Sequence, residues 1–524
     1  MNAAPTTLTL QEAIAGRHYD AALSALKARL RDEPQTLLDA KDWSKFFTPY
    51  DWFEAEGESE RYLQYATDLI TAVADRAEGL SDQALGKNLA TAFIYGTHFR
   101  FTAHSSGDPR PLMRGRARLF GRALSDSPIP RTHTFATAVA GKRPRLGVLF
   151  KHLRQDPETT SMLPFFEEAK AQGIEVVLFV GSDAIDQKLL QYVSPRCDQV
   201  YRLPDDLGQA ILQIRQCNLD IVFFGNDITA KPSSFAFLSF FRLARLGAFC
   251  VSTISTTASP AMDVYFGSPY HLKFGFDKHF DERFIALPDP SYAFSYPLGR
   301  VQTGIQVTRA QVGVSDETPL FISGANQTKL HKPLIAAWAR ILHRSPGARL
   351  LLYPFPPHYG AARQDIATRV IAHFAEFGIA ENRVIITDGL PRDAVISLLG
   401  QGDLGLDSFP YTGATTLVDA VEAGLPTVSL KGGALRTSHG AAILHAAGFD
   451  DLVVDTVDDY VDLAVRLMEN RPLRMALKAR FVEANRAIPP FLRPKDFSIA
   501  VAQIYHKLHG ELAEGRAPVR EGRI

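Results

Sequence analysis

The sequence predicts an α/β protein in which two doubly wound domains face each other and an all-α domain precedes them. Three observations support this fold class. Residues 7–125 carry apolar side chains at helical spacing, short apolar strands alternate with helices from residue 145, and the same alternation restarts at residue 320. We expect an all-α domain at 1–140, a first α/β domain at 141–310 and a second α/β domain at 311–524.

The composition restricts the class of protein. The chain has 524 residues, equal numbers (57 each) of Lys+Arg and Asp+Glu, and 46% hydrophobic residues, as in an ordinary folded protein. Zero net charge gives no global attraction to nucleic acid or to an anionic membrane. No apolar run reaches the roughly 18 residues of a transmembrane helix, and the N-terminus lacks a signal-peptide pattern. We therefore expect a cytoplasmic protein with no nucleic-acid partner.

The three cysteines give no indication of a disulfide framework or a metal site. Cys197, Cys217 and Cys250 lie far apart and have neither CxxC nor CxxH spacing. The sequence therefore predicts reduced thiols and no zinc site.

The all-α part resembles one helical-repeat unit rather than a repeat array. Apolar and small residues at 11–30 predict one helix that stops at Pro34, and no second copy follows at a period of about 34 residues. Further helices are expected at 60–77 and 80–95. The arginine-rich segment 110–122 is either a basic binding face or the solvated face of a helical bundle.

The two α/β parts show the pattern of parallel sheets covered on both faces. In the first part we expect strands at 145–150, 174–180, 199–203, 221–224, 247–252 and 264–266, and helices at 162–172 and 205–216. In the second we expect strands at 320–323, 349–353, 384–387, 404–407 and 427–430, and helices at 333–343, 363–377, 392–399 and 415–423. A last helical region, 490–510, is expected to pack back across both parts. Ligands of such folds bind outside the carboxyl ends of the strands.

A phosphate site is predicted where the strand at 404–407 ends. The chain has no GxxxxGK[ST] loop, and no GxGxxG follows the opening strand of either half. A loop instead leads from Asp407 into a helix that begins near Thr415, whose free N–H groups and dipole favour an anion. Thr416 adds a second hydroxyl, and Asp419 lies one turn on, where it can accept from a ribose hydroxyl. The alternative is that these side chains only cap their own helix.

Two further loops carry hydrogen-bond donors toward the same place. Asn326, Gln327 and Lys329 follow the strand at 320–323, and a lysine there would offset the charge of a diphosphate. Arg392 begins the helix of a third strand-to-helix connection. The alternative for each loop is a polar surface, but together the three loops predict a nucleotide-diphosphate site.

These segments resemble glycosyltransferase family 41. The similarity is carried by NQTKLHKP, by NRVIITDGLPRDAVISLLGQGDLGLDSFPYTGATTLVDAVEAGLPTV and by LRPKDFSIAVAQIYHKL. It covers about residues 140–510 and is strongest over 321–448. The family includes protein O-GlcNAc transferases and bacterial cytoplasmic protein N-glycosyltransferases. The resemblance implies a GT-B pair of facing Rossmann-like domains, a UDP-sugar donor, and neither a metal ion nor another cofactor.

The resemblance also implies roles for individual residues. Lys329 matches the lysine that contacts the donor diphosphate, and Gln327 lies beside it. Thr415 and Thr416 match paired threonines that hold phosphate, while Asp419 matches the aspartate that binds the ribose. Arg392 stands in place of a lysine that lies by the nucleoside.

The first half departs from the family pattern at the expected catalytic base. The segment RLGVLFKHLRQDPETTSM resembles the opening strand and loop that carry an active-site histidine. Aligned without gaps, Asp156 takes the histidine position, whereas alignment through TTSM places Glu158 there. Either carboxylate can act as a general base if it reaches the acceptor, and His152 is a less favoured substitute. The alternative is a polar surface loop, with chemistry that relies on stabilising the leaving group.

The resemblance therefore predicts an inverting, metal-independent glycosyltransferase. It would move a hexose or N-acetylhexosamine from a UDP-sugar to a protein side chain, and the N-terminal helices would present the acceptor. One alternative is an enzyme that glycosylates a glycan or small molecule. Another is a binding or scaffold protein that keeps the fold without activity.

Overall fold

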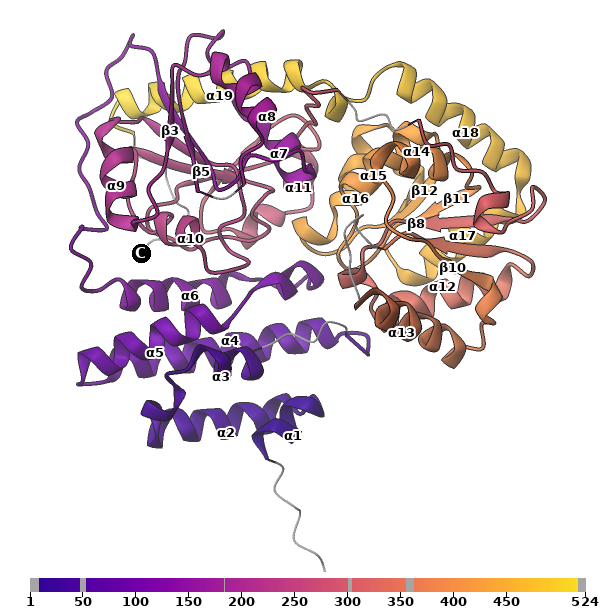
Figure 1. Ribbon diagram of the computed structural model, residues 1–524, viewed down its shortest axis with the longest axis horizontal. Helices are drawn as coiled ribbons and strands as arrows, with labels where there is room; N and C mark the ends of the chain where they lie inside the picture. Colours follow the sequence, from indigo (N-terminus) through magenta and orange to yellow (C-terminus); the bar gives the residue numbers. More distant parts are fainter. Residues whose placement is uncertain (1–8, 48–52, 183, 300–303, 355–361, 517–524) are drawn as a thin grey trace, which may run out of the picture.

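The computed structural model of the protein describes residues 9–47, 53–182, 184–299, 304–354 and 362–516 (Figure 1). Residues 1–8, on which part of the signal-peptide prediction rests, lie outside these ranges. The described residues form a helical module, at the bottom of Figure 1, and two α/β halves that lie above it, each built on a parallel sheet. The predicted fold class is confirmed.

The helical module packs around one long central helix. Its helices are α1 (Leu10–Ala15), α2 (Tyr19–Asp32), α3 (Ala40–Phe46), α4 (Glu58–Gly79), α5 (Gln83–Gly96) and α6 (Arg110–Ala123). α4 contacts α2, α5 and α6, and the core contains the buried rings of Trp43, Tyr62 and Phe93. The prediction of one helix at 11–30 is wrong because Gly16 ends α1 and Arg17 adopts a left-handed conformation with φ 60°.

The first half contains a seven-stranded sheet whose neighbouring strands all pair in parallel. Its strands are β1 (Arg145–Phe150), β2 (Glu175–Val180), β3 (Gln199–Arg202), β4 (Ile221–Phe224), β5 (Leu246–Cys250), β6 (Val264–Gly267) and β7 (Arg283–Ala286). The order is β3-β2-β1-β4-β5-β6-β7, so the sequence prediction omitted only the edge strand β7. The helices are α7 (Pro157–Met162), α8 (Gln187–Val193), α9 (Leu207–Gln216), α10 (Ser234–Leu238) and α11 (Pro269–Lys273).

The expected helix at 162–172 is wrong. α7 instead ends at Met162, and a 3-10 turn over Leu163–Phe165 follows it. Pro157 fits the first turn of α7, but Pro164 has no N–H to continue the helix, which explains the early end.

The second half repeats the arrangement with a six-stranded parallel sheet. Its strands are β8 (Leu320–Ser323), β9 (Arg349–Leu352), β10 (Val384–Ile386), β11 (Leu404–Leu406), β12 (Thr427–Leu430) and β13 (Val453–Val454), in the order β10-β9-β8-β11-β12-β13. The helices are α12 (Lys332–Arg344), α13 (Ala362–Glu376), α14 (Arg392–Gly400), α15 (Thr415–Ala423), α16 (His439–Ala446), α17 (Val457–Glu469) and α18 (Arg471–Arg486). The sequence analysis did not anticipate α16, α17, α18 or β13.

Both sheets reverse the direction of their strand order after the third strand, and the place of this reversal is the switch point of the sheet. The first sheet grows from β1 toward β3 and then restarts on the other side with β4, and the second grows from β8 toward β10 and restarts with β11. Loops at the carboxyl ends of such adjacent strands diverge to opposite faces and leave room for a ligand. The loops after β1, β4, β8 and β11 are therefore the expected walls of a binding site.

The last helix returns to the first half. α19 (Pro494–Ala513) runs across the helices of the first half at the top of Figure 1. Its Phe497 ring lies 5.3 Å from that of Phe165, and Ser498 Oγ accepts a 2.9 Å hydrogen bond from the N–H of Glu168. The last helical region therefore packs back on the first half, in line with part of the prediction that it crosses both halves. In the described part of the chain, no helix has the length and apolar character needed to cross a membrane.

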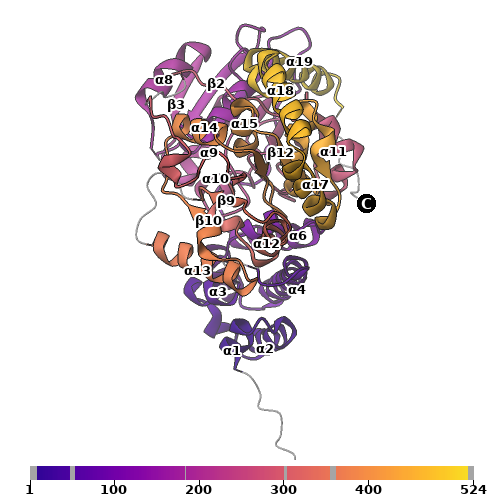
Figure 2. The same ribbon diagram turned by 90° about the vertical axis from the view of Figure 1, so that its right-hand side faces the viewer.

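The helical module is bonded to both halves through the segment between α5 and α6. Phe99 N–H donates to the Ala230 carbonyl of the first half over 2.8 Å. On the other side, the Arg436 guanidinium of the second half donates to the Gly107 carbonyl over 2.5 Å and also to that of Thr102. Figure 2, turned by 90°, also shows the module beneath the α/β halves.

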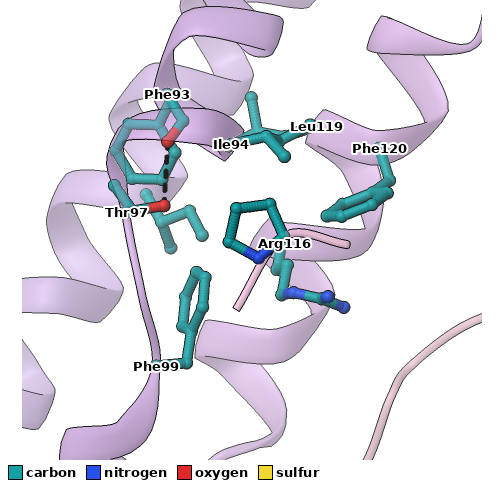
Figure 3. Close-up of a pocket in the computed structure, with 9 residues that line it drawn as sticks. Phe93, Ile94, Thr97, Phe99, Arg116, Leu119 and Phe120 are labelled. Atoms are coloured by element: carbon teal, nitrogen blue, oxygen red, sulfur yellow. Dashed lines mark hydrogen bonds between the residues drawn. The ribbon is translucent and has the colours of Figure 1, made fainter. Parts of the chain in front are cut away.

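Arg116 of α6 forms a buried contact between the module and the first half. Only 2% of it is exposed, its guanidinium lies 4.4 Å from the centroid of the Phe120 ring, and it donates to the Ile228 carbonyl over 2.9 Å. A cavity of about 10 Å³ adjoins it, lined also by Phe99 and Leu119 (Figure 3). Burial lowers the pKa of Arg116 to about 10, although Asp227 opposes this.

Three other arginines of segment 110–122 lie in surface ion pairs, whereas Arg122 donates hydrogen bonds to the Ala77 carbonyl and to Gln83. Arg114 pairs with Asp281 at 2.5 Å, and Arg118 pairs with Asp75 at 2.7 Å and with Glu78 at 2.5 Å. These charges connect helices to one another and to the first half.

Removing the buried arginine should destabilise the protein far more than removing its exposed neighbour. We expect R116A to lower the free energy of unfolding by about 2–4 kcal/mol, because it enlarges a cavity and leaves the Ile228 carbonyl without a donor. The control R118A should cost less than about 1 kcal/mol. Urea denaturation of the full chain measures both, and equal losses would contradict the assignment.

Candidate functional site

Lys329 lies where the loops after β8 and β11 meet. Its side chain is 8% exposed, and its Nζ donates a 2.8 Å hydrogen bond to the Thr412 carbonyl. The ammonium also lies 4.1 Å from the centroid of the Tyr411 ring, a cation–π contact. The side chain is thus folded into the loop after β11.

The buried ammonium of Lys329 has fewer acceptors than donors. A lysine can donate three hydrogen bonds, and the described part of the chain supplies one acceptor and no carboxylate oxygen within 4.0 Å. Burial lowers the pKa of Lys329 to about 8, and the charge of Asp407 only partly opposes this. An anion placed here would accept the remaining hydrogen bonds and stabilise the charge.

Asp407 fixes the shape of the loop that holds Lys329. The carboxylate is buried and accepts from Ser408 N–H and Gly413 N–H at 2.8 Å each and from Ser429 Oγ at 2.6 Å. Burial raises the pKa of Asp407 to about 6, against these donors and the charge of Lys329. Asp407 is therefore engaged in the loop itself, and its charge faces Lys329 at longer range.

The first turn of α15 presents free donors beside this loop. Ala414 occupies the N-cap position and has no side-chain acceptor for the first N–H groups. Among the described residues, the hydroxyls of Thr415 and Thr416 make no hydrogen bond, so neither caps the helix. A Cβ on Gly324 would lie 2.8 Å from the Thr416 methyl, which shows how closely the loop after β8 approaches α15.

Two of the predicted nucleoside contacts are bonded to each other. Arg392 pairs with Asp419 at 2.6 Å and also with Glu422, and its guanidinium lies 4.7 Å from the centroid of the Tyr296 ring. Asp419 is 6% exposed. A ribose hydroxyl that bonded Asp419 would share this carboxylate with Arg392.

The remaining predicted donor-site residues lie at the start of the β8 loop. Asn326 is exposed, and its Oδ1 accepts from the N–H of Thr328 over 3.0 Å. Gln327 has a buried Oε1 that finds no hydrogen-bond donor in the described residues. Gln327 thus has a buried hydrogen-bonding group without a partner among the described residues, whereas Asn326 faces solvent.

The predicted base residues form one ionic cluster after β1. His152 Nε2 lies 3.3 Å from Asp156 Oδ2 and 3.4 Å from Glu158 Oε2. Asp156 is the N-cap of α7 and accepts from the Thr159 N–H over 2.8 Å. The two carboxylates that the sequence left as alternatives are therefore brought together around one imidazole.

The charges of this cluster decide which member can accept a proton. The two carboxylates raise the pKa of His152 to about 9, so the imidazole is cationic at neutral pH and cannot act as a base. Burial alone would raise the pKa of Asp156, but His152 and the Thr159 N–H outweigh burial and lower it. The carboxylates are the candidate proton acceptors.

The cluster is connected to Tyr411 through the loop after β4. Glu158 Oε1 accepts from the Asp227 N–H over 3.0 Å. Burial raises the pKa of Tyr411, and the charge of Asp227 raises it further. Tyr411 thus contacts Lys329 and lies within electrostatic reach of Asp227, whose N–H is bonded to the cluster.

Sequence reasoning missed three polar residues near Lys329. They are Tyr411, whose ring contacts the Lys329 ammonium, and the buried residues Arg436 and His439. The charges of Lys329 and Arg436 both lower the pKa of His439. The segment KGGALRTSHG directly follows β12, so its position after a further strand end was the available signal.

The second half matches a known family. Residues 299–499 fit the family described as glycosyl transferase family 41, and this segment holds Lys329, Arg392 and the α15 terminus. The match covers the second α/β half and the start of α19, and it does not extend to the first half or the helical module.

The chain matches only a small part of two similar plant proteins. A tomato (Solanum lycopersicum) protein named probable UDP-N-acetylglucosamine–peptide N-acetylglucosaminyltransferase SPINDLY is 27% identical over 206 residues, or 38% of this chain and 21% of its own length. An Arabidopsis thaliana protein with the same activity in its name, SEC, is 25% identical over 211 residues, or 40% and 21%. The chain thus spans about a fifth of these relatives.

A solved structure shares the fold over nearly the whole chain. A mutant of the Thermobaculum terrenum O-GlcNAc transferase superposes with a TM-score of 0.69 and 20% identity, covering 97% of this chain and 92% of that one. The chain therefore has the GT-B arrangement with a helical N-terminal module.

The His152 cluster should make stability depend on pH. The folded-state pKa of His152, about 9, exceeds its unfolded value near 6.5, so its stabilisation is complete below pH 6.5 and is lost as the pH rises through 9. We expect the unfolding free energy of wild type to exceed that of H152Q by on the order of 1 kcal/mol at pH 6 and to converge with it by pH 10. A difference that stays constant over this range would contradict the ionic cluster.

Proposed function

We propose that this chain transfers a sugar, with N-acetylglucosamine as the first choice, from a UDP-sugar to a protein side chain. One observation carries the proposal: a buried lysine with unused donors lies beside an uncapped helix terminus at the switch point of the second sheet. The match of the second half to glycosyl transferase family 41 and the names of the two relatives support the same reaction. They also favour a protein acceptor over a glycan or small molecule.

In this proposal the donor lies along the carboxyl ends of β8 and β11. Lys329 and the N–H groups and hydroxyls of Thr415 and Thr416 hold the diphosphate. The Arg392–Asp419 pair holds the nucleoside, and Asn326 and Gln327 line the entry to the diphosphate site. These cationic and N–H donors neutralise the leaving group, so we propose that no metal ion and no other cofactor is required.

The proposed reaction is a single displacement. An acceptor oxygen or nitrogen attacks the anomeric carbon, the bond from that carbon to the diphosphate oxygen breaks, and UDP leaves with the electron pair. Asp156 or Glu158 takes the acceptor proton, and Lys329 stabilises the charge that develops on the diphosphate. Attack opposite the leaving group inverts the configuration at the anomeric carbon.

We infer that the helical module presents the acceptor and that the protein works in the cytoplasm. The module is hydrogen-bonded to the loop after β4, next to the carboxylate cluster, and so an acceptor bound there would lie close to the proposed base. The three cysteines are free and buried, as is typical of a reducing compartment.

The proposed reaction is tested with purified full-length protein, labelled UDP-GlcNAc and a cell extract. We expect labelled protein to form, and to form equally in the presence of EDTA. Of the variants D156N and E158Q, the one that removes the catalytic base should lower turnover about 10²–10⁴-fold. Asn at 156 can still cap α7, so folding is retained. The control D186N changes the equivalent cap of α8, outside the site, and should leave turnover unchanged.

Each of the other outcomes would overturn one part of the proposed function. Wild-type protein that neither transfers nor hydrolyses UDP-sugars would make the chain a binding or scaffold protein. Full turnover in both D156N and E158Q would exclude both carboxylates as the base. Label found only on glycans would exclude the protein acceptor.

A further inference from the structure

Two buried imidazoles face the proposed donor site from opposite halves. His271 lies on α11 of the first half and is 0% exposed, whereas His439 is the first residue of α16 in the second half and is 3% exposed. Their ring centroids are 6.3 Å apart and their planes are nearly perpendicular. The helices that carry them pack together, with Tyr270 against Ala441 and Ala442.

Each imidazole has a nitrogen that the described residues leave without a hydrogen-bond partner. These atoms are His271 Nε2 and His439 Nδ1, and both are inaccessible to solvent. Buried polar atoms are nearly always paired, because an unpaired one loses its hydration without compensation. Two such atoms on neighbouring rings therefore indicate a polar group that the chain itself does not provide.

Ser268 occupies the other ring nitrogen of His271. Ser268 Oγ accepts from the backbone N–H of His271 over 3.4 Å and lies 3.0 Å from its Nδ1. Nδ1 therefore has a partner within the chain, and only Nε2 is left for a further polar group.

His439 is packed directly on the loop that holds Lys329. The N–H of its neighbour Gly440 donates to Thr412 Oγ1 over 3.1 Å, and Thr412 also gives its carbonyl to Lys329. A Cβ on Gly440 would lie 2.1 Å from Asp407 Oδ2, so only glycine allows α16 to approach this closely. His439 is thus next to the proposed diphosphate position and on the side that faces the first half.

Both rings are neutral at physiological pH, which selects the chemistry of the missing partner. Burial lowers the pKa of His439 to about 3, aided by the charges of Lys329 and Arg436, and burial lowers the pKa of His271 well below its usual value. A neutral imidazole offers one donor and one acceptor. This pattern suits hydroxyl or amide groups, which both donate and accept, while the full charge of a diphosphate is better matched by Lys329.

We propose that His439, together with His271, binds the sugar of the donor through its hydroxyl or amide groups. This inference rests on the proposed function, because it takes the diphosphate to lie at Lys329. The sugar attached to that diphosphate would then lie on the side of Lys329 that faces the first half. Because one histidine comes from each half, the sugar would bridge the two sheets. The pair would then distinguish a nucleotide sugar from the bare nucleotide.

The test compares the binding of UDP and of UDP-GlcNAc to full-length variants by calorimetry. We expect H439L to weaken UDP-GlcNAc binding about fivefold to tenfold and to change UDP binding less than twofold, because it removes a contact to the sugar alone. H271L should act in the same way, and H439N, which keeps a polar group near Nδ1, should recover part of the loss. The control is H445L, on the same helix, where His445 pairs with Asp450 at the surface.

The other outcomes overturn the inference. Equal weakening of UDP and UDP-GlcNAc would place His439 at the diphosphate, and unchanged affinities would mean that a buried water alone fills the gap. H439N keeps the test valid if H439L fails to fold, because it retains polarity in the same place. Wild-type protein that binds neither ligand would instead overturn the proposed function, and this inference with it.

Discussion

The burial of one ammonium group, that of Lys329, constrains the architecture around the proposed site. In the loop after β11, the Thr412 carbonyl accepts a hydrogen bond from this ammonium and the Tyr411 ring contacts it. Asp407 stabilises the loop by accepting three hydrogen bonds. The loop after β8 and helix α16 pack closely around this region because Gly324 and Gly440 have no side chain. Keeping a cation here is unfavourable by itself, so the geometry is explained if an anion binds.

The helical module takes part in the same construction. The Phe53 N–H donates to His331 Nδ1 over 2.8 Å, which leaves the proton of that ring on Nε2, 2.8 Å from His104 Nδ1. The His104 ring lies 5.6 Å from that of Tyr411, so a chain of buried rings leads from the module to Lys329. With Arg116 bonded to the loop after β4, the module supports both the diphosphate side and the base side of the site.

The sequence was sufficient for the alternation of strands and helices, because each buried parallel strand is a short apolar run with a clear boundary. It was sufficient too for the placing of Lys329, Thr415 and Thr416 in one region, since these residues follow strands that turn out to flank a switch point. It was insufficient where single residues redirect the chain, as Gly16 and Pro164 do. Nor does spacing show that Arg392 pairs with Asp419, or that His152 joins Asp156 to Glu158, because these contacts depend on how separate loops fold toward each other.

The whole arrangement depends on Lys329 being the cation of a diphosphate site. Calorimetric titration of UDP into wild type, K329M and the control K332M measures this, since Lys332 lies three residues away and pairs at the surface with Glu376. We expect K329M to weaken UDP binding about 10–100-fold through the loss of charge-assisted hydrogen bonds, while K332M binds like wild type. Equal UDP affinity in wild type and K329M would show that Lys329 does not hold the diphosphate.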